Sequence, residues 1–204
     1  ASDLTFIDGT VCKVRSLDSI CDYEMLPSFD QVRSDPHAYA ESFAVQYRAS
    51  DPIRGKRLVE PYGPSLFVVQ NPPAAPLTTA ELDAVYRLPF TRAWHPDHDA
   101  EGGVPALSEV RFSLTSSRGC FGECAFCALT FHQGRIVQAR SHESLLDEAR
   151  RLVADPAFKG YIHDVGGPTA NFRAPACAAQ LERGACPAKR CLAPEPCAQL
   201  EAGH

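Results

Sequence analysis

The sequence predicts an α/β protein built on one βαβ unit, with a helix and hairpin region before it and a cysteine- and proline-rich tail after it. Apolar and polar residues alternate over 110–116, as in a strand, and residues 160–165 are a second strand candidate that ends at Gly166-Gly167-Pro168. Residues 142–154 carry one apolar face, as in an amphipathic helix. This order implies parallel strands and a right-handed crossover. We therefore divide the chain into residues 1–105 and residues 106–204.

The composition excludes several classes of protein. Hydrophobic residues make up 45% and charged residues 22% of the chain, as in ordinary globular proteins, and no apolar run could span a membrane. The net charge of −5 gives no global reason to expect a nucleic-acid partner. Nine cysteines without a secretory pattern favour a reducing compartment, so we expect a cytoplasmic protein. The chain starts at Ala1 and its only methionine is Met25, which suggests a segment of a longer gene product.

The N-terminal half begins with a short strand candidate at residues 10–14. Ser28 is a helix cap, and Asp35-Pro36 is a second cap with proline at the first helical position. In the helix that follows, Tyr39, Phe43 and Tyr47 recur every four residues, which predicts a packing face.

A hairpin is expected over residues 58–70, with its turn at residues 62–65. Thr78 and Glu81 form a capping box that opens the next helix. Residues 88–105 are interpreted as loop, and residues 130–140 as a polar and basic linker.

Three cysteines, Cys120, Cys124 and Cys127, stand at the spacing C-x3-C-x2-C, with Phe126 immediately before the last. Three thiolates on a short loop can hold three corners of a cubane iron–sulfur cluster and leave one iron open to a small molecule. A zinc site completed by His132, or three free thiols, are the alternatives. Zinc sites favour paired C-x2-C units, so the spacing fits the cluster better.

This motif resembles the radical S-adenosylmethionine (SAM) signature. Three longer stretches, residues 118–135, 164–171 and 47–73, are similar to the YgiQ-type radical SAM family. The resemblance implies an incomplete radical-SAM-type partial (βα) barrel, of which residues 106–204 would be the start. It also implies that Cys120, Cys124 and Cys127 bind a 4Fe-4S cluster.

The same resemblance implies a SAM site. Phe126 would lie against the adenine, and the backbone of Gly166 and Gly167 would hold the amino group of SAM. Glycines at a strand end allow such a close approach, although Pro168 stands where the superfamily often has an acidic residue. Arg140 or Arg135 is a candidate partner of the SAM carboxylate, the alternative being solvated linker arginines.

The function implied is reductive cleavage of SAM to a 5′-deoxyadenosyl radical that acts on an unidentified substrate. Its expected partners are SAM, that substrate, a reducing electron donor and the remainder of the full-length protein, with no membrane. The competing function is a metal- or cluster-stabilised binding module that contacts RNA through its basic loop.

The tail contains four more cysteines, Cys177, Cys186, Cys191 and Cys197. Their spacings match no common zinc pattern. A proline-rich segment without a core of its own needs support from the α/β unit or from a staple. A second metal or cluster site and four free thiols are therefore both open.

Overall fold

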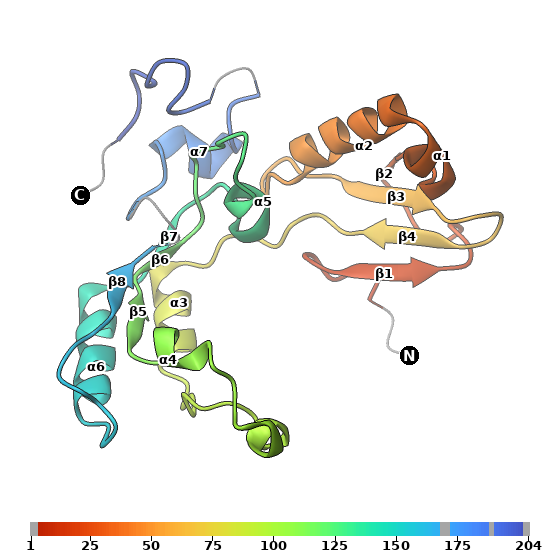
Figure 1. Ribbon diagram of the computed structural model, residues 1–204. Helices are drawn as coiled ribbons and strands as arrows, with labels where there is room; N and C mark the ends of the chain where they lie inside the picture. The colour runs from red at the N-terminus through yellow and green to blue at the C-terminus, as the bar shows by residue number, and fades with distance from the viewer. Residues whose placement is uncertain (1–3, 168–171, 188–189, 202–204) are drawn as a thin grey trace.

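Figure 1 shows the computed structural model of the chain, which describes residues 4–167, 172–187 and 190–201. Within these residues the strands form three small sheets, one of four strands and two of two strands each, without a closed barrel. No helix among them is long and apolar enough to cross a membrane. The expected α/β class is confirmed, but the partial barrel is not, because the βαβ unit forms a two-stranded sheet.

The four-stranded sheet belongs to the N-terminal half and has the strand order β1-β4-β3-β2. Its strands are β1 (Val11–Val14), β2 (Tyr23–Met25), β3 (Arg57–Pro61) and β4 (Phe67–Gln70). Strands β3 and β4 form the predicted antiparallel hairpin, in which Val59 is opposite Val69 and both side chains are fully buried. Strand β2 joins the other edge of β3 in a parallel pair.

Two helices, α1 (Phe29–Ser34) and α2 (Pro36–Ala49), begin where the sequence places their caps. Ser28 forms a capping box at the start of α1, and the Asp35 carboxylate accepts the His37 N–H at the start of α2. The buried contacts between this pair and the sheet come from Leu26, Val45, Ala49 and Leu58.

The predicted aromatic face of α2 is only partly correct. Tyr39 and Phe43 are 60% and 50% exposed, so neither lies in the sheet's core. Phe43 and Tyr47 instead contact Phe131, with ring centroids 5.7 and 5.2 Å away. The face that covers the sheet carries smaller residues, including Val45 and Ala49.

Three helical segments lead from the sheet to the βαβ unit: α3 (Thr79–Tyr86), η1 (Pro96–Glu101) and α4 (Leu107–Val110). Helix α3 begins with the predicted capping box, in which the Thr78 N–H donates to the Glu81 carboxylate at 2.8 Å. The expected loop over residues 88–105 therefore contains one short 3-10 helix, η1.

The βαβ unit consists of β5 (Ser113–Thr115), α6 (His142–Val153) and β8 (Asp164–Gly166). Its strands are parallel, as predicted, with Leu114 opposite Val165. Both are shorter than predicted: helical hydrogen bonding runs on to Arg111, whose N–H donates to the Leu107 carbonyl, so residue 110 is not in a strand. The core between the helix and the strands contains Phe112, Leu114, Leu145 and Leu152.

Residues 130–140 are not a simple linker, which corrects the prediction. They include most of α5 (Leu129–Gln133) and all of β7 (Gln138–Ala139), and β7 pairs antiparallel with β6 (Ser117–Arg118). The physical reason is the apolar pair Ile136 and Val137, which are only 2% and 4% exposed and draw the segment into the interior.

The tail packs against the segment that follows β6. Its one described helix is α7 (Ala178–Arg183), which lies beside the chain connecting β6 and α5 in Figure 1. Phe121 and Val137 from the body of the protein are buried together with Ala176, and tail residues Phe172 and Leu192 are packed against them. The tail thus shares a core with the α/β unit.

Candidate functional site

The cysteine loop starts directly after β6 and is fixed at its base. Gly119 has a φ of +89°, and a side-chain Cβ there would overlap the Ile136 carbonyl oxygen. The Cys120 N–H donates to the Gly134 carbonyl at 2.9 Å, and the Cys120 carbonyl accepts the Thr130 hydroxyl at 3.1 Å. Two segments from beyond the loop therefore hold the first cysteine in position.

The three thiols of the loop are all free but unequally exposed: Cys120 is buried, Cys127 is half-buried and Cys124 is exposed. A Cβ built on Gly122 would lie 3.3 Å from the Sγ of Cys120 and 3.6 Å from the Sγ of Cys124. Two of the sulfurs therefore lie on the same side of the Gly122 backbone. The Gly122 N–H also donates to the Cys120 Sγ at 3.4 Å, a contact that would stabilise a thiolate at this position.

A single metal ion does not suit this arrangement. In the described part of the chain, no group of three or more His, Cys, Asp or Glu side chains is placed to hold one ion. The zinc alternative, completed by His132, therefore has no support in the side-chain positions. An iron–sulfur cube is larger than an ion and separates its thiolate ligands more widely.

A buried ion pair closes one side of the loop. The Arg135 Nη1 lies 2.7 Å from the Glu123 carboxylate, and both side chains are less than a tenth exposed. Arg135 also lies over the Tyr47 ring at 4.2 Å and donates to the Tyr47 carbonyl at 2.8 Å. Glu123 has a positive φ of 49°, uncommon for a residue other than glycine. Arg135 is thus an anchor of the loop to α2 rather than a solvated linker residue.

The pKa of the Tyr47 hydroxyl is influenced by the same ion pair, Glu123 and Arg135. Burial raises the pKa of its hydroxyl above the ordinary value, and the Glu123 carboxylate raises it further, while Arg135 acts in the opposite direction. Glu123 and Arg135 are 12 positions apart in the sequence, and no helical or strand spacing signals that they pair. Sequence reasoning therefore missed Glu123 as a structural partner of the loop.

Phe126 lies at the surface of the cysteine loop. Its side chain is 92% exposed, immediately before Cys127, and it belongs to none of the buried clusters. A phenyl ring without a packing partner in the described structure is able to stack on a planar group such as adenine. The contact with SAM itself stays a prediction.

Gly166 lies at the same edge as the start of the cysteine loop. It ends β8, is paired with Thr115 of β5, and its carbonyl accepts the Ser116 N–H at 2.8 Å. The carboxyl ends of parallel strands share one edge, and β5 continues from there through β6 into the loop. Gly166 therefore lies next to Ser116, the residue between β5 and β6, and the three cysteines follow β6 in the chain. Residues 168–171, which include Pro168, lie outside the described residues.

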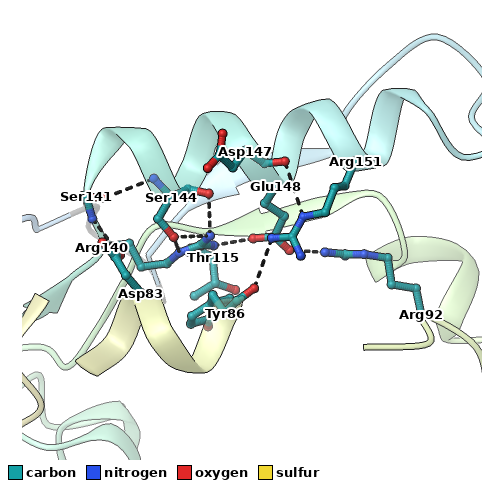
Figure 2. Close-up of polar contacts among 10 residues, drawn as sticks. All are labelled: Asp83, Tyr86, Arg92, Thr115, Arg140, Ser141, Ser144, Asp147, Glu148 and Arg151. Carbon is teal, nitrogen blue, oxygen red and sulfur yellow. Dashed lines mark hydrogen bonds and ion pairs between the residues drawn. The ribbon is translucent and has the colours of Figure 1, made fainter. Parts of the chain in front are cut away.

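Arg140 lies in a polar network beside α6, drawn in Figure 2. Its side chain is fully buried and forms an ion pair with Glu148. Its Nε and Nη2 donate to the Ser144 hydroxyl at 3.1 and 2.9 Å, and its Nη1 donates to the Thr115 carbonyl at 3.1 Å. Every nitrogen of the guanidinium thus has a protein acceptor. Pairing with the SAM carboxylate stays a prediction, and it would require Arg140 to leave these partners.

The network extends to both neighbouring helices, as Figure 2 shows. Arg92 forms a second ion pair with Glu148, and the Asp83 carboxylate accepts the Ser141 N–H at 3.0 Å. Burial alone would raise the pKa of Asp83, but hydrogen bonds from Ser141 and Ser144 and the charge of Arg87 hold it below its ordinary value. Asp83 therefore supports the start of α6 as an ionised group.

The tail covers the loop from the other side. Phe121, which follows Cys120, stacks on Phe172 with ring centroids 3.9 Å apart. Cys191 and Leu192 pack on the same cluster. No periodic pattern predicts these contacts, because the apolar residues of the tail are isolated from one another in the sequence.

Comparison with known proteins agrees with the resemblance drawn from the motifs. Residues 1–113, more than half of the chain, match the family described as Radical SAM N-terminal. A UPF0313 protein of Clostridium botulinum (strain 657 / Type Ba4) is 50% identical over 198 residues, which are 97% of this chain and 31% of the relative. A UPF0313 protein of Clostridium perfringens (strain 13 / Type A) is 51% identical over 199 residues, which are 97% of this chain and 30% of the relative.

The chain thus spans about a third of the length of these curated relatives. No solved structure matches it. The expected family resemblance is confirmed by the matches, which cover the cysteine loop as well as the N-terminal half.

Proposed function

Because this chain belongs to the radical SAM N-terminal family, we propose that its loop binds a 4Fe-4S cluster and that the protein cleaves SAM reductively. The observation that carries the proposal is three free thiols on one loop that follows the parallel pair of β5 and β8. Cys120, Cys124 and Cys127 come after β6, which begins two positions after the end of β5, and Gly166 ends β8. The carboxyl edge of parallel strands is where α/β folds place their ligands.

The donor set fits the cluster. Three thiolates satisfy three irons of a cube and leave the fourth for SAM. The Gly122 N–H supplies a hydrogen bond to the Cys120 sulfur, and the buried base of the loop keeps water from that side. When bound, the reduced cluster would supply the electron that splits SAM into methionine and a 5′-deoxyadenosyl radical.

The chain's own residues would bind and orient SAM. Phe126, exposed at the end of the loop, offers a ring to the adenine. Gly166 and Gly167 offer a backbone edge without side chains for the amino group. Arg135 and Arg140 would act indirectly, because the first is paired with Glu123 and the second with Glu148.

Iron analysis tests the cluster. Anaerobically reconstituted protein, produced from its complete gene, should be brown and lose that absorbance on reduction with dithionite. Cys120→Ala should remove about four iron atoms per chain, the content of one cube. Cys21→Ala is the matched control, because Cys21 is exposed and lies outside the loop. Unchanged iron in Cys120→Ala would refute the assignment.

A SAM-cleavage assay tests the proposed enzymatic activity. We expect 5′-deoxyadenosine and methionine from the cluster-loaded protein with dithionite, and neither from Cys120→Ala. A protein that holds its cluster but releases neither product would be a cluster-stabilised binding module, the competing function.

Segments outside this chain are proposed partners of the site. Among the described residues, β5 and β8 pair only with each other, so neither outer edge of this parallel pair has a neighbouring strand. An open edge leaves SAM accessible to water from that side. Per loaded cluster, we expect slower SAM cleavage by the 204-residue chain than by the full-length Clostridium perfringens relative. Equal rates would show that the described strands suffice.

A further inference from the structure

Four cysteines of the tail surround one cavity. Cys177, Cys186, Cys191 and Cys197 all line a hollow of about 280 Å³ beside α7. All four are free thiols, and none belongs to the loop of Cys120. Their spacing in the sequence does not predict this convergence, which depends on how the tail folds.

Hydrogen bonds from several directions hold the four cysteines around the cavity. Cys177 immediately precedes α7, and its carbonyl accepts the Gln180 N–H at 3.1 Å. Cys186 follows Ala185, whose N–H donates to the buried Asp51 carboxylate. The Cys197 N–H donates to the Cys191 carbonyl at 2.9 Å, which closes the loop between these two cysteines. The thiols are thus brought together by backbone contacts that need no metal.

The walls of the cavity suit a negatively charged metal group. Apart from the cysteines, they include Ala176, Ala179, Ala185 and Leu200, which keep the interior apolar. Arg54, Arg183 and Arg190 also line it. Four thiolates on an iron–sulfur cube carry net negative charge, and guanidinium groups at the rim would balance it.

A single zinc ion fits less well. Tetrahedral zinc with Zn–S bonds of about 2.3 Å needs its sulfurs about 3.8 Å apart. No group of three or more cysteine, histidine or acidic side chains in the described residues is placed to hold one ion. The spacings between the four cysteines also lack the C-x2-C pairs of zinc sites. A cavity of about 280 Å³ has room for a larger group.

The geometry points to a second iron–sulfur cluster, held by Cys177, Cys186, Cys191 and Cys197 in the cavity beside α7. Binding exchanges the four thiol protons for bonds to iron and releases them to water. Four protein ligands leave no iron open, so this cluster does not bind SAM. Cys191 and Leu192 pack on the cluster of side chains that contains Phe121, so the second cluster would fasten the tail over the loop.

Iron and sulfide analysis of the protein produced from its complete gene tests this inference. After anaerobic reconstitution, we expect about eight iron and eight sulfide per chain, as two cubes require. A triple variant, Cys120→Ala with Cys124→Ala and Cys127→Ala, should keep about half of both. The quadruple variant with serine at the four tail positions should lose the other half, and Cys21→Ser should lose neither.

The outcomes separate this inference from the proposed function. A triple variant without iron, zinc in place of iron and sulfide, or four iron per chain that the quadruple variant retains would each overturn the second cluster. The zinc result does not depend on whether any variant folds. Loss of all iron in the quadruple variant, with full iron in the triple variant, would refute the loop cluster and leave the tail cluster standing.

Discussion

The guanidinium of Arg140 lies over the ring of Tyr86, with its Cζ atom 4.0 Å from the ring centroid. Tyr86 ends α3 and Arg140 lies just before α6, so the contact joins the helix before the cysteine loop to the helix after it. The same guanidinium donates to the Thr115 carbonyl at the end of β5. Arg140 therefore connects three elements through one rigid group.

Replacing Arg140 with alanine should destabilise the protein strongly. It would leave Glu148, which is buried, with only one of its two arginine partners. Breaking a buried ion pair costs about 3–5 kcal/mol, and we expect the lower end because Arg92 remains. Arg150→Ala is the control: its pair with Asp147 on the same helix is exposed, so the loss should stay below about 0.5 kcal/mol. Urea unfolding measures both.

Equal unfolding midpoints for the two variants would contradict this structural role. The variant Arg140→Lys distinguishes this structural role from direct SAM binding. Lysine keeps the positive charge but cannot reproduce the several hydrogen bonds that the planar guanidinium donates. We expect Arg140→Lys to lower stability and to leave SAM affinity per loaded cluster unchanged. Unchanged stability with weakened SAM binding would instead favour the SAM carboxylate as the partner.

The sequence was sufficient to predict features that depend on neighbouring residues. It was insufficient to predict contacts between distant segments. Caps at Ser28, Asp35 and Thr78, the hairpin and the parallel βαβ unit follow from patterns within a few residues, and all are confirmed. The ion pairs of Arg135 and Arg140 were not predicted, because Glu123 and Glu148 become partners only when separate segments pack. For the same reason Arg135 and Arg140, for which a solvated position was one of two alternatives, are buried.

In the candidate site, too, local features were predictable and contacts between distant segments were not. The motif identified the three loop cysteines without any structure, but it gave no sign of how the tail covers them. Phe172 and Leu192 are isolated apolar residues in a proline-rich segment, a composition that predicts no core. Their burial against Phe121 and Val137 depends on surface that the body of the protein leaves uncovered.

Glu123→Gln should loosen the cysteine loop. The change removes the charge that pairs with buried Arg135 and leaves that arginine uncompensated. We expect faster alkylation of Cys120, which is buried, in the cluster-free protein under native conditions. Cys21 is the internal reference, because it is exposed and lies outside the loop, so its rate should not change. Mass spectrometry after a timed iodoacetamide pulse gives both rates, and an unaltered Cys120 rate would show that the pair does not hold the loop.

Asp83 should stabilise the folded protein at neutral pH, and this stabilisation should be lost at acid pH. Its folded pKa lies below the unfolded value of about 3.9, so the ionised form is favoured by folding. That stabilisation is present above the unfolded pKa and is lost as pH falls through the folded pKa. Asp83→Asn should therefore be less stable than the unmodified protein at pH 7, with a difference that shrinks below about pH 4.

Unfolding free energies between pH 3 and pH 7 check this expectation. Asp30→Asn is the control, because Asp30 is exposed in the first turn of α1. A constant difference between Asp83→Asn and the unmodified protein over the whole range would rule out the charge of Asp83 as its source.

Gly119→Ala should prevent the loop from holding its cluster. At a φ of +89° an alanine is strained, by roughly 1 kcal/mol for a left-handed residue, and its Cβ would also overlap the Ile136 carbonyl oxygen. Ile136 is 2% exposed and has little room to retreat, so the first cysteine would have to move. Gly102→Ala shares the positive φ, at +82°, but has no atom within 4 Å of its Cβ, so it carries the backbone strain alone. We expect Gly119→Ala to lose about four iron atoms per chain and Gly102→Ala to keep them. Equal iron in the two variants would mean that the close approach of Gly119 to Ile136 is not needed to position Cys120.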